Sequence, residues 1–432
     1  MIITIIYLIA ITIFMIQCFI MFFVYFNEQK PYKYALKNAH SSRTPANRFF
    51  YFILIPCLNE EKVIQDTLRN VLKLPGQKQI IVIDDDSTDD TLIQIHDVKG
   101  PIDTVERKLP NARTGKGDSL NAAMPKIQTY IRQHHLDPRF CIVGVIDADG
   151  VLSSNSIYKL DDAFSNQYTD AVQLRVKMKA PKKLLQTFQD IEFFTINHLI
   201  QMFRTNLNAV ALCGNGQFFR YSSITKKLGD TPWGNALLED YELTLRMELH
   251  GLNIRYVGDA YVDQEALLSV KKLVIQRARW AQGGLNCWKY FREIVTSKQM
   301  SSAQKLDTYF FFFQPVLNLL ADFSIIYLTA SFILRYLNNP EFLIVSILSL
   351  AVVGLFFGTI FTMIYLHELR LNDKAKLVID PADMFNIQIH LRKLFMAIGL
   401  ISYIYIILFF SLLLSVYHEL IGQTSWNKTK RN

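Results

Sequence analysis

Three acidic clusters carry the side chains that are best suited to chemistry. They are Asp84–Asp86, Asp147–Asp149 and the pair Glu239 and Asp240. Clustered carboxylates repel one another unless water, a cation or a ligand compensates their charge. Hard divalent cations are bound through carboxylate oxygens while they also bind phosphate oxygens. The clusters therefore indicate chemistry on a substrate that bears phosphate.

The second cluster has the form Asp-x-Asp after an apolar run. The run Cys141–Ile146 is predicted to be a buried strand, and Gly150 lets the backbone turn closely behind it. Carboxylates two residues apart at a strand end suit a divalent cation bound to a diphosphate. We expect this role for Asp147 and Asp149, with a solvated turn as the structural alternative.

The first cluster also follows an apolar run. A carboxylate of Asp84 or Asp85 at that point can accept hydrogen bonds from a nucleobase imide or from ribose hydroxyls. The alternative is helix capping, because polar side chains precede a helix that is predicted to begin at Thr91. Both interpretations can hold, and we assign Asp89 and Asp90 to capping rather than to catalysis.

Lys116 lies between two glycines but not in a Walker A motif. That motif requires glycine where Pro110 stands, and serine or threonine where Gly117 stands. We expect Lys116 to meet a phosphate; the alternative is a solvated basic loop.

The third cluster begins a predicted helix, Asp240–His250. The functional interpretation makes Asp240 a general base that removes a proton from an acceptor hydroxyl. The structural interpretation is that carboxylates are favoured at a helix N-terminus by the helix dipole.

The segment Gln276–Trp280 adds cationic and aromatic side chains. Trp280 can stack on a sugar, Gln276 can hydrogen-bond to one, and Arg277 and Arg279 can bind a departing diphosphate. An amphipathic helix at a membrane surface would explain the tryptophan and the arginines, but not their order after the acidic clusters.

Buried strands alternating with helices are expected to position these residues. The apolar runs Phe49–Ile55, Gln79–Ile83 and Phe140–Ile146 each end in polar residues, and Glu61–Leu72 and Asp118–His134 are helix-like. This alternation predicts an α/β domain with a mostly parallel sheet. Ligands bind such sheets at the carboxyl ends of the strands, where the acidic clusters lie.

Long apolar segments at both ends of the chain predict about four membrane spans, at residues 2–26, 309–334, 342–366 and 394–417. Basic residues accumulate on the cytoplasmic side of spans. Five follow the first span: Lys30, Lys33, Lys37, Arg43 and Arg48. We therefore expect a multi-pass cell-membrane protein with a cytoplasmic catalytic domain and an outside C-terminus.

Two amphipathic stretches, Pro181–Asn206 and Leu267–Val295, are expected to lie against the membrane surface, with ordinary core helices as the alternative. The net charge of +8 is better explained by basic cytoplasmic flanks than by nucleic acid. The five scattered cysteines argue against a disulfide framework.

Residues 50–285 resemble membrane-embedded family-2 glycosyltransferases, which include cellulose, hyaluronan and poly-N-acetylglucosamine synthases. Five elements match in order: Ile55-Pro56 through Asn59-Glu60; Asp84-Asp85 with Ser87–Asp89; Gly115-Lys116 with Leu120-Asn121; Asp147–Gly150; and Glu239-Asp240 followed by Gln276–Trp280. Asp86 replaces a usual glycine, Leu238 a frequent threonine and Leu267 a frequent proline. None of these departures removes a catalytic group.

The resemblance implies a GT-A fold, an inverting mechanism and a divalent metal, Mg²⁺ or Mn²⁺, held by Asp147 and Asp149. It implies Asp240 as the catalytic base. Its implied nucleotide-sugar ligands are Asp84, Asp85, Lys116, Asp147, Gln173, Arg175, Arg277 and Arg279. Its implied acceptor contacts are Cys213, Gly214, Glu239, Gln276 and Trp280.

We therefore expect a transmembrane anchor at 1–27, a GT-A domain with interfacial helices at 49–305 and transmembrane helices at 306–420. The expected activity is transfer from a UDP-sugar to a growing β-linked polysaccharide at the membrane, with accessory secretion proteins as partners and no nucleic acid. Single-sugar transfer to a lipid or polyprenyl phosphate stays open. So do a transporter or receptor with a nucleotide-sensing domain, and a metal-dependent phosphatase.

Overall fold

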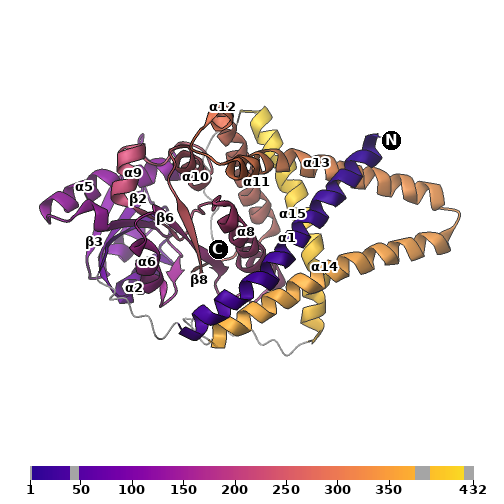
Figure 1. Cartoon of the computed structure of the whole chain (residues 1–432), viewed down its shortest axis with the longest axis horizontal. Coiled ribbons are helices and arrows are strands. Elements are labelled where there is room, and N and C mark those ends of the chain that lie inside the picture. Colours follow the sequence, from indigo (N-terminus) through magenta and orange to yellow (C-terminus); the bar gives the residue numbers. More distant parts are fainter. Residues whose placement is uncertain (1, 39–47, 375–389, 423–432) are drawn as a thin grey trace.

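The computed structural model describes residues 2–38, 48–374 and 390–422. The basic residue Arg43 and the tail after residue 422 lie outside the described residues. A sheet with its flanking helices forms one end of the molecule, and long helices form the other (Figure 1).

Eight strands form a single mixed, mostly parallel sheet in the order β3-β2-β1-β4-β7-β6-β8-β5. They are β1 (Phe50–Cys57), β2 (Gln77–Asp85), β3 (Ile102–Arg107), β4 (Cys141–Val145), β5 (Val151–Leu152), β6 (Ala171–Met178), β7 (Gln217–Arg220) and β8 (Ile254–Gln264). Strands β3, β2, β1 and β4 are parallel neighbours, whereas β7 runs antiparallel between β4 and β6. The predicted α/β class is confirmed, and the three predicted strands correspond to β1, β2 and β4.

Helices are distributed over the sheet and beside it. They are α1 (Ile2–Asn38), α2 (Ile64–Lys73), α3 (Thr91–His96), α4 (Lys116–Asn121), α5 (Met124–Gln133), α6 (Ser156–Ser165), α7 (Leu184–Asp190), α8 (His198–Leu207), α9 (Tyr221–Leu228), α10 (Glu239–Leu249), α11 (Val270–Asn286), α12 (Phe291–Thr296), α13 (Ser302–Tyr336), α14 (Pro340–Lys374) and α15 (His390–Leu420). The short helices η1 (Pro138–Phe140) and η3 (Cys287–Tyr290) are 3₁₀, and η2 (Ile191–Asn197) is a π-helix.

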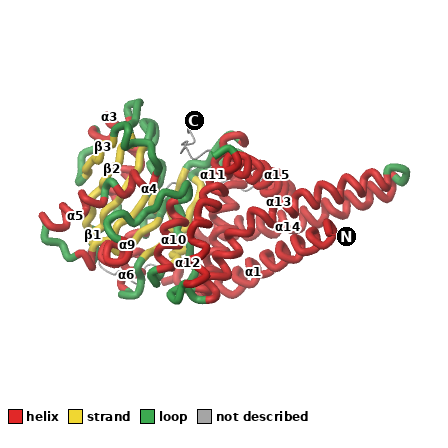
Figure 2. Tube along the Cα trace, turned by 90° about the horizontal axis from the view of Figure 1, so that it is seen from above, coloured by secondary structure: helices red, strands yellow, loops and turns green. Residues whose placement is uncertain are grey.

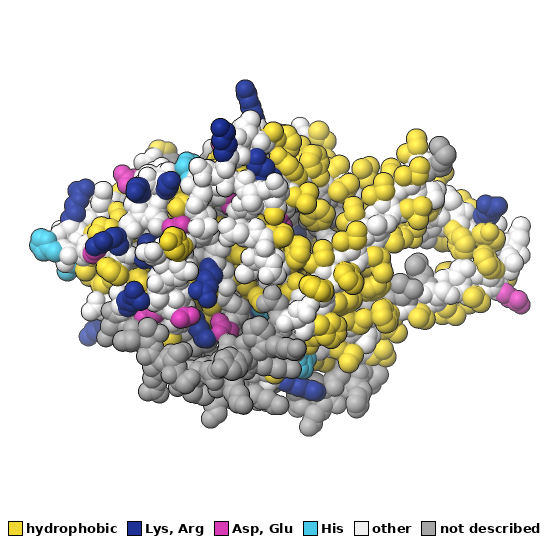
Figure 3. All heavy atoms as spheres, viewed as in Figure 1, with side chains coloured by type: hydrophobic (Ala, Val, Ile, Leu, Met, Phe, Trp, Pro, Cys, Tyr) yellow, Lys and Arg dark blue, Asp and Glu magenta, His cyan; other side chains and the backbone are white. Residues whose placement is uncertain are grey.

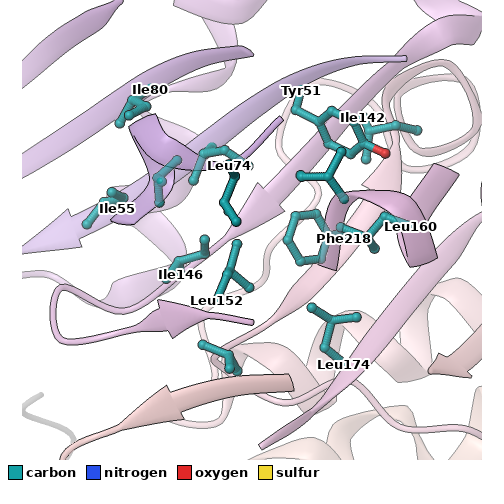
Figure 4. Close-up of a cluster of buried hydrophobic side chains, with 14 of the residues drawn as sticks. Tyr51, Ile55, Leu74, Ile80, Ile142, Ile146, Leu152, Leu160, Leu174 and Phe218 are labelled. Atoms are coloured by element: carbon teal, nitrogen blue, oxygen red, sulfur yellow. The ribbon is translucent and has the colours of Figure 1, made fainter. Parts of the chain in front are cut away.

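Alternate side chains of the strands build a hydrophobic layer on each face of the sheet. On one face, Tyr51 and Ile53 of β1 pack with Leu68 of α2 and Leu160 of α6. Figure 4 shows part of this layer, including Tyr51, Leu160 and Phe218. On the other face, a second layer joins the strands to α4, α5, α9 and α10. Because both faces are covered, the strands read as continuous apolar runs in the sequence.

The four predicted spans correspond to α1, α13, α14 and α15, each with a segment long and apolar enough to cross a membrane. Figure 2 shows these helices extending away from the sheet. Hydrophobic side chains gather over this half of the visible face, whereas most charged side chains lie over the sheet-containing half (Figure 3).

The two amphipathic stretches form α7, η2 and α8 in the first case and α11 in the second. Phe188 of α7 and Leu273 of α11 share a buried cluster with Phe361 of α14 and Leu400 of α15. These helices therefore lie between the sheet and the long apolar helices. Their position at a membrane surface stays a prediction.

Candidate active site

The first two acidic clusters come together because β2 and β4 flank β1, and the third cluster, at the start of α10, lines the same cavity. In the register of β1 and β2, Cys57 pairs with Asp84, and β4 lies on the other side of β1. A cavity of about 530 Å³ opens at these strand ends. It is lined by residues of the strand-end loops and of η2, α10 and α11, and it continues to α13 and α15.

The first acidic cluster is held by basic groups and backbone N–H groups. Asp85 lines the cavity, accepts a 2.6 Å hydrogen bond from Arg107 and accepts another from the backbone N–H of Arg113. Burial raises the pKa of Asp85, although these two partners oppose the shift. Asp84 is fully buried and accepts a hydrogen bond from the backbone N–H of Ser87. The structure thus places Asp85 at the cavity and Asp84 behind it.

Asp86 occupies a left-handed backbone conformation, with φ of +68°. Glycine adopts this conformation most readily, and aspartate tolerates it better than most residues. The side chain of Asp86 pairs with Lys108 and Arg113. The departure from the family's usual glycine is therefore compatible with the same turn.

Asp89 is a structural residue, as the capping interpretation predicts. It accepts hydrogen bonds from the backbone N–H groups of Thr91 and Glu61. It thereby joins the loop after β2 to the loop after β1. Asp90 is the N-cap residue of α3, but its side chain makes no capping hydrogen bond.

Lys116 lies at the centre of the cavity's acidic residues. Its Nζ is 2.7 Å from Asp147, 3.5 Å from Glu239 and 2.9 Å from the carbonyl oxygen of Gly214. Burial disfavours its charge, but Asp147, Glu239 and Asp240 outweigh burial and raise the pKa of Lys116. The alternative of a solvated basic loop is therefore wrong for Lys116.

Asp240 has the electrostatic environment of a general base. Burial and the adjacent Glu239 raise the pKa of Asp240 to about 7, although Lys116 opposes the shift. A base of this pKa exchanges protons readily near neutral pH. Asp240 also begins α10, so the helix-dipole interpretation applies to the same residue.

Gly214 stands where an added side chain would have little room. A Cβ at this position would lie 3.1 Å from Lys116 Nζ and 3.4 Å from Asp240 Oδ2. Cys213 also lines the cavity, and burial raises the pKa of its thiol to about 12. Cys213 is therefore a neutral wall residue at physiological pH rather than a thiolate.

Gln173 lies behind the part of the cavity wall formed by Cys213 and Asn215 and is hydrogen-bonded to the backbone of both residues. The side chain is fully buried, accepts a 2.7 Å hydrogen bond from the Cys213 N–H and donates one to the Asn215 carbonyl oxygen. Asn215 in turn accepts a hydrogen bond from the backbone N–H of Asp147. The structure therefore places Gln173 as a support of the cavity wall.

Arg175 does not line the cavity. Its guanidinium is 1 % exposed and donates 3.1 Å hydrogen bonds to Glu368 of α14. It also donates a hydrogen bond to the carbonyl oxygen of Phe194 and lies 3.6 Å from the centroid of the Phe194 ring. The structure thus places Arg175 between the sheet and a long apolar helix, away from the other candidate donor ligands.

The two arginines of α11 have different surroundings. Arg279 lines the cavity, and its Nε has no hydrogen-bond partner among the described residues. Burial lowers the pKa of Arg279, against the attraction of Glu239, Asp147 and Asp240. These three carboxylates, together with Lys116, form what we call the acidic centre. A buried cation beside it is suited to an incoming anion.

Arg277 is already paired with a carboxylate of the protein, that of Glu192. It donates a 2.8 Å hydrogen bond to Glu192 of η2, and Tyr403 of α15 donates one of 2.6 Å to the same carboxylate oxygen. The Arg277 guanidinium lies 4.1 Å from the ring centroid of Trp280, and Phe193 meets that ring edge-on. Arg277 thus fixes an aromatic platform at the cavity wall, which Gln276 and Trp280 also line.

The oxygen donors of the cavity suit a divalent cation that is shared with a ligand. Asp147 has 26 % of its side chain exposed, whereas Asp149 is buried and accepts a hydrogen bond from the backbone N–H of Glu265. In the described part of the chain, no three His, Cys, Asp or Glu side chains form a metal site by themselves. Mg²⁺ bound with a nucleotide usually uses one or two carboxylates plus phosphate oxygens. Asp147 fits that pattern, with Asp149 as support behind it.

Asn215 and Glu192 line the cavity but were not predicted from the sequence. Asn215 stands between two glycines after Cys213, which signals a tight loop near a ligand. Glu192 carried no sequence signal, since its partners Arg277 and Tyr403 are 85 and 211 residues away.

Residues 47–283 match a family described as glycosyltransferase-like family 2. The chain is 27 % identical over 269 residues to a beta-monoglucosyldiacylglycerol synthase of Nostoc sp., covering 61 % of this chain and 54 % of that protein. It is 29 % identical over 235 residues to a poly-beta-1,6-N-acetyl-D-glucosamine synthase of Staphylococcus aureus, covering 54 % and 53 %. The chain thus matches about half the length of these relatives.

Among solved structures, a mannosyltransferase of Pyrobaculum calidifontis, in complex with GDP-Man and Mn²⁺, is similar with a TM-score of 0.55. The identity is 14 %, and the similarity covers 85 % of this chain and 99 % of that one. This similarity shows the fold, and it confirms the predicted GT-A type.

Proposed function

This chain belongs to glycosyltransferase family 2, and from that premise we propose that it transfers a sugar from a UDP-sugar to an acceptor hydroxyl with inversion. The observation that carries the proposal is one cavity in which Asp240, with a pKa of about 7, lies near two cations, Lys116 and Arg279. A base for the acceptor and positive charge for a diphosphate are the two requirements of this transfer.

The base acts on the acceptor. Asp240 removes the proton from the attacking hydroxyl as its oxygen forms a bond to the anomeric carbon. The bond from that carbon to the diphosphate oxygen breaks, and UDP leaves with the electron pair. Attack and departure occur on opposite faces, so the configuration at the anomeric carbon inverts. Glu239 and Trp280 line the same cavity, and we assign them to the acceptor.

The donor is bound by groups that neutralise its charge. Asp85 holds the nucleoside, with Asp84 buried behind it. Lys116 and Arg279 stabilise the charge that develops on the diphosphate. Gln173 and Cys213 keep the wall in place around Gly214. Asp147, supported by Asp149, would hold Mg²⁺ or Mn²⁺, which supplies further charge neutralisation when it is bound with the donor.

We propose a growing β-linked polysaccharide as the product, with a single sugar added to a lipid or polyprenyl phosphate as the second candidate. One relative is named for a poly-N-acetylglucosamine and another for a glucosylated diacylglycerol, which supports both candidates. The catalytic domain at 49–305 would face the cytoplasm, anchored by 1–27 and 306–420, because basic residues follow the first span. Accessory secretion proteins would be partners of the polymer-forming enzyme.

The test uses the full chain in lipid nanodiscs with a panel of UDP-sugars and Mg²⁺ or Mn²⁺. UDP release is followed, and the labelled product is sized. High-molecular-weight product from one donor is the expected result. UDP release with only a single-sugar product would select the lipid acceptor instead. UDP-sugar binding without turnover would indicate a sensing domain, and release of inorganic phosphate without sugar transfer would indicate a phosphatase; either result overturns the proposal.

A further inference from the structure

The cavity does not end at the acidic centre. Its lining also includes residues of α13 and α15, and both helices are candidate membrane spans. Polar members of this lining are Gln314 and Asn318 of α13 and Ser411 of α15. Because polar side chains inside a membrane are costly, such a group indicates a functional site.

The backbone of α13 adds a further polar group to this lining. Pro315 lies inside the helix and has no N–H, so the Phe311 carbonyl oxygen lacks its helical donor. Phe311, Gln314, Pro315 and Asn318 all line the cavity. Gln314 and Asn318 are four residues apart and so lie on one helix face. These groups offer hydrogen-bond donors and acceptors without carrying a charge.

The cations of the cavity that lie outside the acidic centre are already paired. Arg204 is 3.0 Å from Asp307, and Arg277 is 2.8 Å from Glu192. Lys116 and Arg279 face the acidic centre, where the donor's diphosphate is proposed to bind. Among the described lining residues of α13 and α15, none is a lysine or an arginine.

The nearest charge farther along the same face of α13 is negative. Asp322 is four residues beyond Asn318 and is 8 % exposed, and its Oδ2 has no hydrogen-bond partner within the described ranges. Lys116 and Arg279 are assigned to the donor's diphosphate. Among the described residues, a phosphate group on the acceptor would then meet carboxylates near Asp240 and no further unpaired cation of the lining. A neutral hydroxyl compound meets amide side chains and a backbone carbonyl that can bind it.

We propose that the acceptor is an uncharged, hydroxyl-bearing molecule whose polar part is bound by Gln314, Asn318 and the Phe311 carbonyl oxygen. This inference rests on the proposed transferase function and narrows its acceptor. The acceptor hydroxyl belongs to a sugar or to a glycerol, and a polyprenyl phosphate is excluded. The residues concerned form a subsite separate from the donor-binding residues.

The first experiment compares acceptors for the full chain in nanodiscs, with the UDP-sugar panel and Mn²⁺. The acceptors are dioleoylglycerol, a short β-linked oligosaccharide and undecaprenyl phosphate. Labelled product from dioleoylglycerol or from the oligosaccharide is expected, and which of the two reacts identifies the source of the hydroxyl. Product from undecaprenyl phosphate overturns the inference but keeps the transferase. No product and no UDP release with any acceptor overturns both.

The second experiment tests the subsite itself with the reactive acceptor. Gln314→Leu and Asn318→Leu each remove a neutral hydrogen-bonding group, so each is expected to raise the acceptor KM by about 3- to 10-fold. UDP affinity, measured by calorimetry with Mn²⁺, is expected to be unchanged. The matched control is Val316→Leu, at a position of α13 that is 46 % exposed and does not line the cavity. An unchanged acceptor KM in both leucine variants would refute the subsite.

Discussion

At the scale of single residues, Asp240 is the proposed catalytic base. It combines burial, a neighbouring carboxylate and a nearby lysine, which together set its pKa near 7. Asp240→Asn keeps the shape of the side chain but removes its basicity. We expect kcat to fall by about 10²- to 10⁴-fold, as for other general bases, while UDP affinity is retained. Asp66→Asn, at an exposed position of α2, is the control, and near-normal turnover of Asp240→Asn would refute the assignment.

The same pKa predicts a pH dependence. A carboxyl group acts as a base only when it is deprotonated, and burial raises the pKa of Asp240 to about 7. Activity is therefore present above pH 7 and is lost as pH falls through that value. We expect log kcat/KM to rise by about one per pH unit below this point and then to level. A profile that is flat between pH 5 and pH 8 would show that another group accepts the proton.

The two arginines of α11 are predicted to separate donor binding from wall structure. Arg279→Met removes the cation beside Asp147 and Asp240, so UDP affinity should fall by about 10- to 100-fold. Arg277→Met removes a cation that Glu192 already pairs, so UDP affinity should change by less than about 3-fold. Calorimetry with UDP and Mn²⁺ checks both. An equal loss of UDP affinity in the two variants would show that Arg277 also contributes to donor binding.

At the scale of elements, the loop before β7 sets the spacing of the acidic centre. A Gly214→Ala side chain would crowd Lys116 and Asp240, which lie within 3.4 Å of the added Cβ. We expect at least a tenfold loss of kcat with an unchanged melting temperature, because the crowded atoms are side-chain ends. Gly354→Ala on α14 is the matched control, since its Cβ would meet nothing within 4 Å. Unaltered kcat in Gly214→Ala would mean that the loop adapts.

Three adjacent residues of the π-helix η2 make different contacts. Glu192 and Phe193 line the cavity, while the carbonyl oxygen of Phe194 accepts hydrogen bonds from Arg175. Such π-helical turns are rare and frequently occur at functional sites. Here the turn connects the platform around Trp280 to the long helices through Tyr403.

At the scale of the whole molecule, one buried ion pair joins the sheet to the helices beyond it. Arg175 of β6 and Glu368 of α14 are both at most 5 % exposed in their side chains. Removing one partner leaves a buried charge uncompensated, so Glu368→Ala should destabilise the fold by about 3–5 kcal/mol. The double variant Arg175→Met with Glu368→Met should recover most of that loss, because both charges are removed. Thermal unfolding measures both, and an unchanged melting temperature of Glu368→Ala would show that the two parts are not coupled here.

The sequence by itself determined three of the strands, the long apolar helices and their order along the chain. Runs of apolar residues predicted β1, β2 and β4 and the four long apolar helices, because such patterns depend on neighbouring residues only. The first two acidic clusters could be placed at strand ends for the same reason. One predicted helix, Asp118–His134, is instead divided into α4 and α5.

Only the tertiary structure decided which candidate residues face the cavity. Arg175 and Arg277 were both candidate donor-binding cations, yet each is paired by a carboxylate from a distant segment. Asp149 is buried behind Asp147 because the backbone of Glu265 donates to it. The pKa of Asp240 likewise depends on Lys116, which is far away in the chain. Electrostatic and hydrogen-bonding partners act through space, so no local pattern could assign them.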